Sequence, residues 1–233
     1  MKLNKNKFIL SILVIILLGI IFIVKQYSLF NVILSVLLCI PFCCKKPKIR
    51  EFVILAIIIV FSAISRILFV FTPNFNPVCV ITIICGIVFK QAAGMMCGTL
   101  SVLISNLLLP MTPWTFFEIL SMGLIGFISG VLGDKLDQQK KLLYGYGVIC
   151  SIVWWLIMSI VTIFISYGSF TVDNCLKVLF LSYPNLLIGI LSNLIFMYLL
   201  CKYMLQIFKR IKLKYDIINT WWIAILCFIV YWI

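Results

Sequence analysis

The chain has 233 residues, of which 65% are apolar and only 11% are charged. This composition excludes a soluble protein, because so few polar residues cannot cover an apolar core with a hydrated surface. The net charge of +13 does not require a nucleic-acid partner, since basic cytoplasmic loops of a membrane protein account for it. We therefore expect an integral membrane protein in contact with the lipid bilayer.

Apolar runs long enough to cross a membrane occur along most of the chain. A helix needs about 20 apolar residues to cross a hydrocarbon layer of roughly 30 Å. The runs are continuously apolar rather than alternating, so they predict an all-α fold and not a β-barrel. The first run is expected to be retained, because no small-residue cleavage site follows it. Nine spans are predicted, at 8–24, 28–44, 52–71, 78–108 (two spans with a break near Lys90), 117–133, 144–167, 178–201 and 217–233.

The basic residues predict how the helices are oriented. If the N-terminus is cytoplasmic, 16 of the 19 Lys and Arg residues fall in cytoplasmic segments, only Lys25 and Lys177 fall in outer segments, and Arg66 lies within a span. This distribution agrees with the positive-inside rule. We therefore expect a multi-pass protein of the cell membrane with a cytoplasmic N-terminus.

Residues for catalysis and metal binding are scarce. The chain has no histidine, and its ten cysteines contain no C-x-x-C pair, so zinc, haem and thiol–disulfide sites lack their usual ligands. A P-loop is also missing, so ATP hydrolysis would belong to another chain. The six acidic residues are too few for the carboxylate clusters that phosphate-processing membrane enzymes use. We expect no enzymatic activity and no cofactor.

Two proline-bracketed loops interrupt the apolar runs, one at 71–77 and the other at 110–115. One helical hairpin separates them, so both are expected on the same, outer side of the membrane. Proline stiffens each loop, while the Asn, Thr and Trp side chains offer hydrogen bonds and a flat apolar face. Such a pair of loops is suited to binding a sizeable polar solute.

Several polar residues border these loops, and each has two interpretations. Arg66 lies roughly 22 Å along its helix from Glu51, where it contacts either a ligand or only the membrane interface. Asn106 precedes the second loop and either bonds a neighbouring helix or contacts a ligand. Trp114 is either a binding residue or part of an interfacial aromatic belt. Glu118 directly follows the second loop and is the acidic residue nearest the expected outer cavity.

Small residues recur at helical spacing on two of the predicted spans, where they allow neighbouring helices to approach closely. Both stripes are predicted to be packing seams, and Asn185 is also a candidate site residue because it lies at the outer end of its span. The stripes consist of Gly123, Gly126, Gly130 and Gly133, and of Ser182, Asn185, Gly189 and Ser192.

From Arg50 to about Tyr215 the chain resembles the substrate-specific (S) component of an energy-coupling-factor (ECF) vitamin transporter, in particular the cobalamin-type subgroup. It departs from the subgroup in the residues before P-W-T, which are usually rich in Gly and Gln, and at Glu118, where glutamine is expected. The motifs that carry the resemblance are R-E-x-V-x-x-A at 50–56, an arginine (Arg66) before P-x-F-x-P-V at 73–78, S-N at 105–106 before P-W-T at 113–115, a G-L-I-G-x-x-x-G stretch at 123–130, and R-I-K-x-K-Y at 210–215.

The resemblance implies a six-helix substrate-binding core over 51–215, with two extra helices in 1–50 and a short transmembrane helix in 216–233. It implies that the core captures a vitamin and topples against a coupling transmembrane subunit that is driven by two ATP-binding subunits. Cobalamin or a related corrinoid is the expected substrate. The alternatives are another vitamin, a precursor or a modified base, and a subunit of a membrane assembly that transports nothing.

The expected site residues come from both loops, their flanking helices and the later span. For substrate binding they are Arg66, Asn74, Phe75, Asn76, Asn106, Thr112, Trp114, Thr115, Glu118 and Asn185. In S components, small residues on the first core helix form the face that contacts the coupling subunit. Here the residues at those positions are Ala56, Val60 and Ala63.

Overall fold

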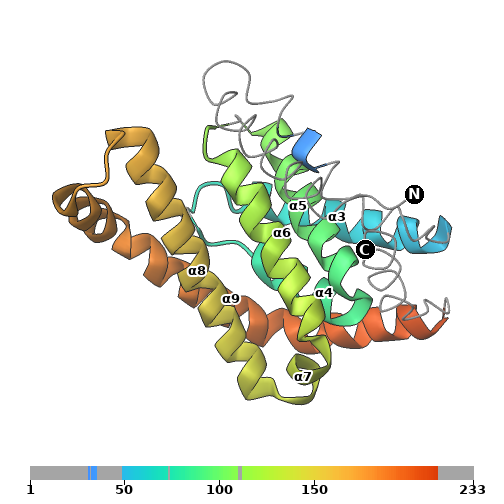
Figure 1. Ribbon diagram of the computed structural model, residues 1–233. Coiled ribbons are helices and arrows are strands. Elements are labelled where there is room, and N and C mark those ends of the chain that lie inside the picture. Colours follow the sequence, from blue (N-terminus) through green and yellow to red (C-terminus); the bar gives the residue numbers. More distant parts are fainter. Residues whose placement is uncertain (1–30, 32, 36–48, 73, 110–111, 215–233) are drawn as a thin grey trace, which may run out of the picture.

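The computed structural model describes residues 31, 33–35, 49–72, 74–109 and 112–214. The expected spans at 8–24, 28–44 and 217–233 lie outside these residues or almost entirely so. Within the described residues the all-α prediction is confirmed (Figure 1). The helices are α3 (Ile49–Leu68), α4 (Val78–Phe89), α5 (Gln91–Leu108), α6 (Thr115–Val131), α7 (Gly133–Gln138), α8 (Lys140–Tyr167) and α9 (Val172–Lys214).

Four of the described helices, α3, α5, α8 and α9, are long and apolar enough to cross a membrane, while α4 and α6 are shorter apolar helices. Large apolar side chains are exposed along α3, α8 and α9, including Ile57 at 64% and Phe180 at 87%. Such extensive apolar exposure is unfavourable in water but suits contact with lipid. The structure therefore supports a multi-pass membrane protein, whereas its orientation stays a prediction.

The predicted break near Lys90 is confirmed, because α4 ends at Phe89 and α5 begins at Gln91. Lys90 has a φ of 71°, a backbone conformation that residues other than glycine rarely adopt. Its ammonium group lies 2.6 Å from an Asp134 carboxylate oxygen. The chain can thus reverse direction at this point within a single residue.

The last core span is longer than predicted. Apolar residues predict a helix over 178–201, but α9 has 43 residues and continues through Pro184. At 1.5 Å per residue α9 is about 64 Å long, roughly twice the hydrocarbon thickness. Hydropathy detects only the apolar part of such a helix, so the polar turns at both ends were missed.

Helices α4, α5 and α6 pack with their backbones in contact. All residues of α4 are buried. A Cβ atom added at Gly126 would lie 2.2 Å from the carbonyl oxygen of Gly94, and one added at Gly130 would lie 2.4 Å from the Cα of Gln91. The predicted glycine seam on α6 is therefore confirmed.

The second predicted seam, on α9, does face α8, but hydrogen bonds rather than close backbone approach form the contact. A Cβ atom added at Gly189 would meet no atom of the described residues within 4 Å. The serines of this stripe form hydrogen bonds instead, because Ser182 accepts one from Trp155 and Ser192 bonds the backbone of Asn76. Spacing alone does not distinguish a seam of close backbone contact from a row of hydrogen-bonding side chains.

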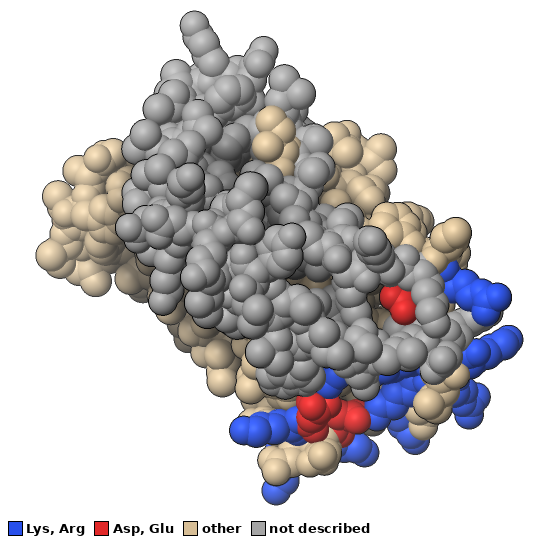
Figure 2. Space-filling view, turned by 45° about the vertical axis from the view of Figure 1, so that its right-hand side comes forward, with Lys and Arg blue, Asp and Glu red and all other residues tan. Residues whose placement is uncertain are grey.

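Charged residues gather at one end of the molecule, where α7 and the last turns of α9 lie (Figure 2). Lys209 pairs with Asp137 at 2.6 Å, and the Lys212 ammonium donates to the Val88 carbonyl oxygen at 2.7 Å. These lysines belong to segments that are predicted to be cytoplasmic. Their position leaves the opposite, less charged end for the two proline-bracketed loops.

Candidate functional site

Three adjoining hollows lie where the connection between α3 and α4 passes the α8–α9 pair, with volumes of about 170, 50 and 470 Å³. Asn74 and Trp154 line all three, so the hollows meet at these two side chains, and together they are called the cavity. The first loop contributes Asn74, and Trp114 of the second loop lines the largest hollow. The prediction that both loops border one cavity is thereby confirmed.

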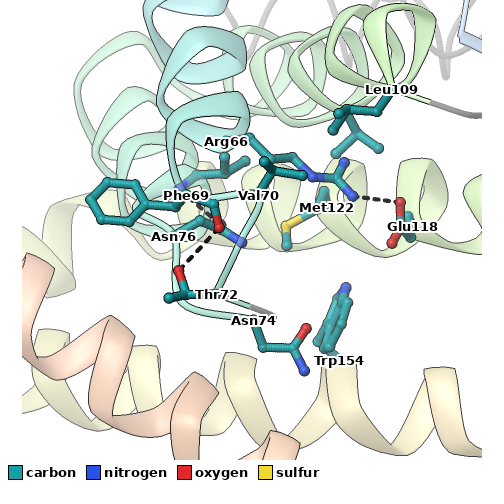
Figure 3. A pocket seen from close by; sticks show the side chains of 12 residues that line it. Arg66, Phe69, Val70, Thr72, Asn74, Asn76, Leu109, Glu118, Met122 and Trp154 are labelled. Carbon is teal, nitrogen blue, oxygen red and sulfur yellow. Dashed lines mark hydrogen bonds and ion pairs between the residues drawn. The ribbon is translucent and has the colours of Figure 1, made fainter.

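An ion pair connects three helices at the wall of this cavity (Figure 3). Arg66 of α3 lies 2.8 Å from a carboxylate oxygen of Glu118 on α6, and both side chains are 19% exposed. Arg66 also donates to the Ser105 hydroxyl on α5 at 3.2 Å, while the Asn106 amide donates to Glu118 at 3.1 Å. Charges are costly within a membrane protein unless they are paired, and here each charge has a partner.

Thr112 and Thr115 of the second loop, both expected binding residues, form hydrogen bonds that stabilise the conformation of the loop, as does Asn106 beside it. Thr115 is completely buried. Its hydroxyl accepts hydrogen bonds from the Asn106 amide at 3.2 Å and from the Thr112 backbone N–H at 3.1 Å. None of these three lines the cavity. They hold the loop so that Trp114, whose indole donates to Thr162 at 3.2 Å, lines the largest hollow.

The first loop divides its residues between the cavity and the core. Asn74 has a φ of 62°, which asparagine tolerates better than most residues, and its side chain reaches the cavity (Figure 3). Phe75 points elsewhere, because its ring packs 5.2 Å from that of Phe196 and 5.7 Å from that of Phe69. The structure thus places Phe75 against the apolar core rather than in the lining of the cavity.

Ser192 of α9 holds the first loop in place. Its hydroxyl accepts a hydrogen bond from the Asn76 backbone N–H at 3.0 Å and donates one to the Asn76 carbonyl oxygen at 3.2 Å. Replacing Ser192 with alanine should lower the free energy of unfolding by about 1 kcal/mol, because both backbone groups lose their partner. Hydrogen exchange at 74–76 should become faster. The control is Ser166→Ala, which removes an exposed hydroxyl; equal exchange rates in the two variants would contradict this role.

Two tryptophans that line the cavity were not among the expected site residues. Trp154 and Trp155 lie near the middle of α8, a helix of 28 residues. The Trp155 indole donates to the hydroxyl of Ser182 at 2.9 Å, whereas the buried indole nitrogen of Trp154 has no hydrogen-bond partner among the described residues. Adjacent tryptophans in mid-span are unusual, since tryptophan gathers at membrane interfaces. The mid-span position of these two tryptophans was the sequence signal that could have identified them as site residues.

The remaining expected residues differ in their surroundings. Asn185 lines two of the hollows from α9. On α3, Ala56 and Val60 are exposed, but Ala63 is only 1% exposed. Ala63 is covered because the C-terminal half of α3 packs into the bundle, where Arg66 reaches α5. Ala56 and Val60 are therefore accessible on the surface of α3, whereas Ala63 is not.

The described residues contain no group of three or more His, Cys, Asp or Glu side chains that could hold a metal ion. The polar groups that line the cavity are instead amides, hydroxyls, indoles and the single ion pair. These groups suit reversible binding through hydrogen bonds and ring contacts.

A family of unknown function, DUF6580, matches residues 45–214, a range that contains every helix from α3 to α9 and all the described residues that line the cavity. The chain belongs to this family. No curated protein and no solved structure matches the chain. The family match therefore covers the residues that form the site without naming an activity for them.

Proposed function

We propose that this member of DUF6580 is the membrane-embedded substrate-binding subunit of an ECF-type importer. The observation that carries the proposal is the single cavity bordered by both proline-bracketed loops, with hollows of about 170 and 470 Å³. Sites for vitamin-sized molecules are typically concave and a few hundred Å³ in volume, with a few placed polar groups. Two of the short motifs that resemble those of S components, at 73–78 and 113–115, include residues of these loops and support the same function.

The distribution of charge supports movement of the whole subunit within the membrane. In the part of the chain that the structure describes, the cavity lining holds only Arg66 and Glu118 as charged residues, and these neutralise each other. A body with few unpaired charges rotates in lipid at lower cost. Without a P-loop, the subunit depends on a coupling subunit and two ATP-binding subunits for energy, and the exposed residues Ala56 and Val60 of α3 are candidates for contact with the coupling subunit.

The sizes of the hollows favour a compact substrate. The motifs resemble those of cobalamin-type S components, but a corrinoid is a large macrocycle with long side chains. Its capture in this cavity would require α8 and α9 to move away from α6. Another vitamin, a precursor or a modified base enters the observed hollows with less rearrangement.

The proposal is tested by thermal unfolding of the purified chain in the presence of a panel of vitamins and precursors that includes cyanocobalamin. A compound that binds only the folded state stabilises it by about 2.7 kcal/mol at 100 times its Kd. We expect one chemical class to raise the apparent Tm, and we expect ATP-binding subunits to co-purify from the native membrane. Failure of both would contradict the importer and favour a subunit of an assembly that transports nothing.

A further inference from the structure

We propose that the solute bound in this cavity is an uncharged, planar heteroaromatic ring that accepts a hydrogen bond from the indole N–H of Trp154. This inference rests on the proposed function and specifies the chemistry of the substrate. It depends on the charges, the aromatic residues and the unpaired hydrogen-bonding groups of the lining.

The charges of the lining disfavour a charged ligand. Among the described residues, Arg66 and Glu118 are the only charged ones that border the three hollows. Their side chains lie 2.8 Å apart, and Arg66 also donates to Ser105. An anion would have to compete with Glu118 for Arg66, and a cation would have to compete with Arg66 for Glu118. A neutral ligand leaves the pair intact and loses no hydration of a charge on entry.

The aromatic residues favour a flat ring. Trp114, Trp154 and Trp155 all line the largest hollow. The indoles of Trp114 and Trp155 are held in place by hydrogen bonds to Thr162 and Ser182. Tryptophan rings that are fixed in this way offer broad faces on which a planar ligand can stack.

Trp154 provides the position of the hydrogen bond. Its indole nitrogen is buried and has no acceptor among the described residues. Figure 3 shows this nitrogen at the end of the ring that points away from α8, toward the part of the cavity where Met122 and Glu118 lie. A buried donor without a partner is unfavourable, and a ring nitrogen or carbonyl oxygen of a ligand would satisfy it. Met122 has a flexible thioether side chain, which can shift to admit the ring.

The side-chain amides of Asn74 and Asn185 favour a ring that both accepts and donates hydrogen bonds. Asn74 and Asn185 line the cavity, and their side chains form no hydrogen bond with the other described residues. Each amide has a donor and an acceptor side by side. A heterocycle with a lactam edge, in which a ring N–H adjoins a carbonyl, matches such groups. An aliphatic ligand would leave these groups and the Trp154 N–H without partners.

The experiment compares uncharged rings with charged analogues of the same shape. The full-length chain in lipid nanodiscs is unfolded thermally with uracil, hypoxanthine, lumazine and nicotinamide, and with orotate and nicotinate as the carboxylate analogues of uracil and nicotinamide. Cyanocobalamin is measured in parallel. We expect at least one uncharged ring to raise the Tm, and neither carboxylate to do so more than its neutral analogue.

The outcomes separate this inference from the proposed function. Stabilisation by orotate, nicotinate or cyanocobalamin in preference to all uncharged rings would overturn the proposal that the substrate is an uncharged ring. It would still agree with the proposed substrate-binding function. The absence of stabilisation by every probe, with cyanocobalamin and the vitamin panel included, would overturn both.

Substitutions at the two neighbouring tryptophans test the hydrogen bond. Trp154→Phe removes an N–H that has no partner among the described residues, so the Tm without ligand should fall less than in the matched control, whereas the affinity for the best uncharged ring should fall about tenfold. The matched control, Trp155→Phe, removes an N–H that is bonded to Ser182 and should lower the Tm without ligand. An unchanged affinity in the Trp154→Phe variant would overturn the assigned hydrogen bond.

A third variant tests the role of charge. Glu118→Gln keeps an acceptor for Arg66 and Asn106 but leaves the guanidinium without a negative partner. The preference for uracil over orotate should then decrease or reverse. An unchanged preference would contradict the electrostatic part of the inference.

Discussion

Replacing Gly126 with alanine should lower the free energy of unfolding by at least about 3 kcal/mol, or prevent folding altogether. The added methyl group would lie 2.2 Å from the Gly94 carbonyl oxygen and 2.8 Å from a methyl group of Thr82. The nearest atom belongs to the backbone of α5, so no change of rotamer relieves the contact. The helices would have to separate, and the apolar contacts of the completely buried helix α4 would be lost with them.

Gly145→Ala is the matched control for this substitution. Gly145 also lies within a long helix, α8, but a Cβ atom added there would meet no atom of the described part of the chain within 4 Å. Alanine is favoured over glycine in helices by about 0.5–1 kcal/mol, so this variant should be as stable as the original chain or more stable. Both variants can be compared by equilibrium unfolding in mixed detergent micelles. Equal stabilities would contradict the close packing of α5 and α6.

Removing one member of the Arg66–Glu118 ion pair should cause the next largest loss in the free energy of unfolding. Arg66→Ala or Glu118→Ala leaves the other charge without its partner at a position that is 19% exposed. Breaking a buried pair in this way costs about 3–5 kcal/mol, and the remaining exposure places the expected loss near 3 kcal/mol. The free energy of unfolding of each variant in detergent measures this loss.

Two further variants separate the effect of unpaired charge from loss of packing. The double variant Arg66→Met with Glu118→Leu removes both charges and should recover most of the lost stability. Lys177→Ala breaks an exposed pair with Asp173, and its effect should stay below about 1 kcal/mol. If the Arg66→Ala variant is as stable as the Lys177→Ala variant, the pair does not hold α3 against α6.

Some residues of the site could be identified from the sequence, but not their contacts. Arg66 and Glu118 were both singled out because charged residues are rare beside apolar spans. Their direct contact was not predicted, because the residues are 52 positions apart and lie on different helices. Asn106 was expected to act either in support or in binding, and the structure shows the supporting contacts.

Three features of the site and its surroundings could not be predicted from the sequence, for one physical reason. Phe75 lies in a loop that borders the cavity, yet its ring packs on Phe196, which is distant in sequence. Trp154 was missed because it lies on a span that has no loop motif. Gly189 was placed in a packing seam by spacing alone, but α8 reaches it through a hydrogen bond from the Ser151 hydroxyl to the Gly189 carbonyl oxygen, and the position of a Cβ atom there is open among the described residues. In each case the direction of a side chain relative to other helices decided its surroundings.

The sequence by itself determined that the protein is a bundle of apolar helices, that the chain reverses near Lys90, and that two stiff loops share one side. These properties follow from hydropathy and from proline, which act locally along the chain. Only the tertiary structure decided that Arg66 meets Glu118 and that Trp154 lies at the junction of the three hollows. Such contacts depend on how far each helix is rotated about its axis and where it crosses its neighbours. That arrangement is set by packing on all sides at once, as where Gly94 meets Gly126.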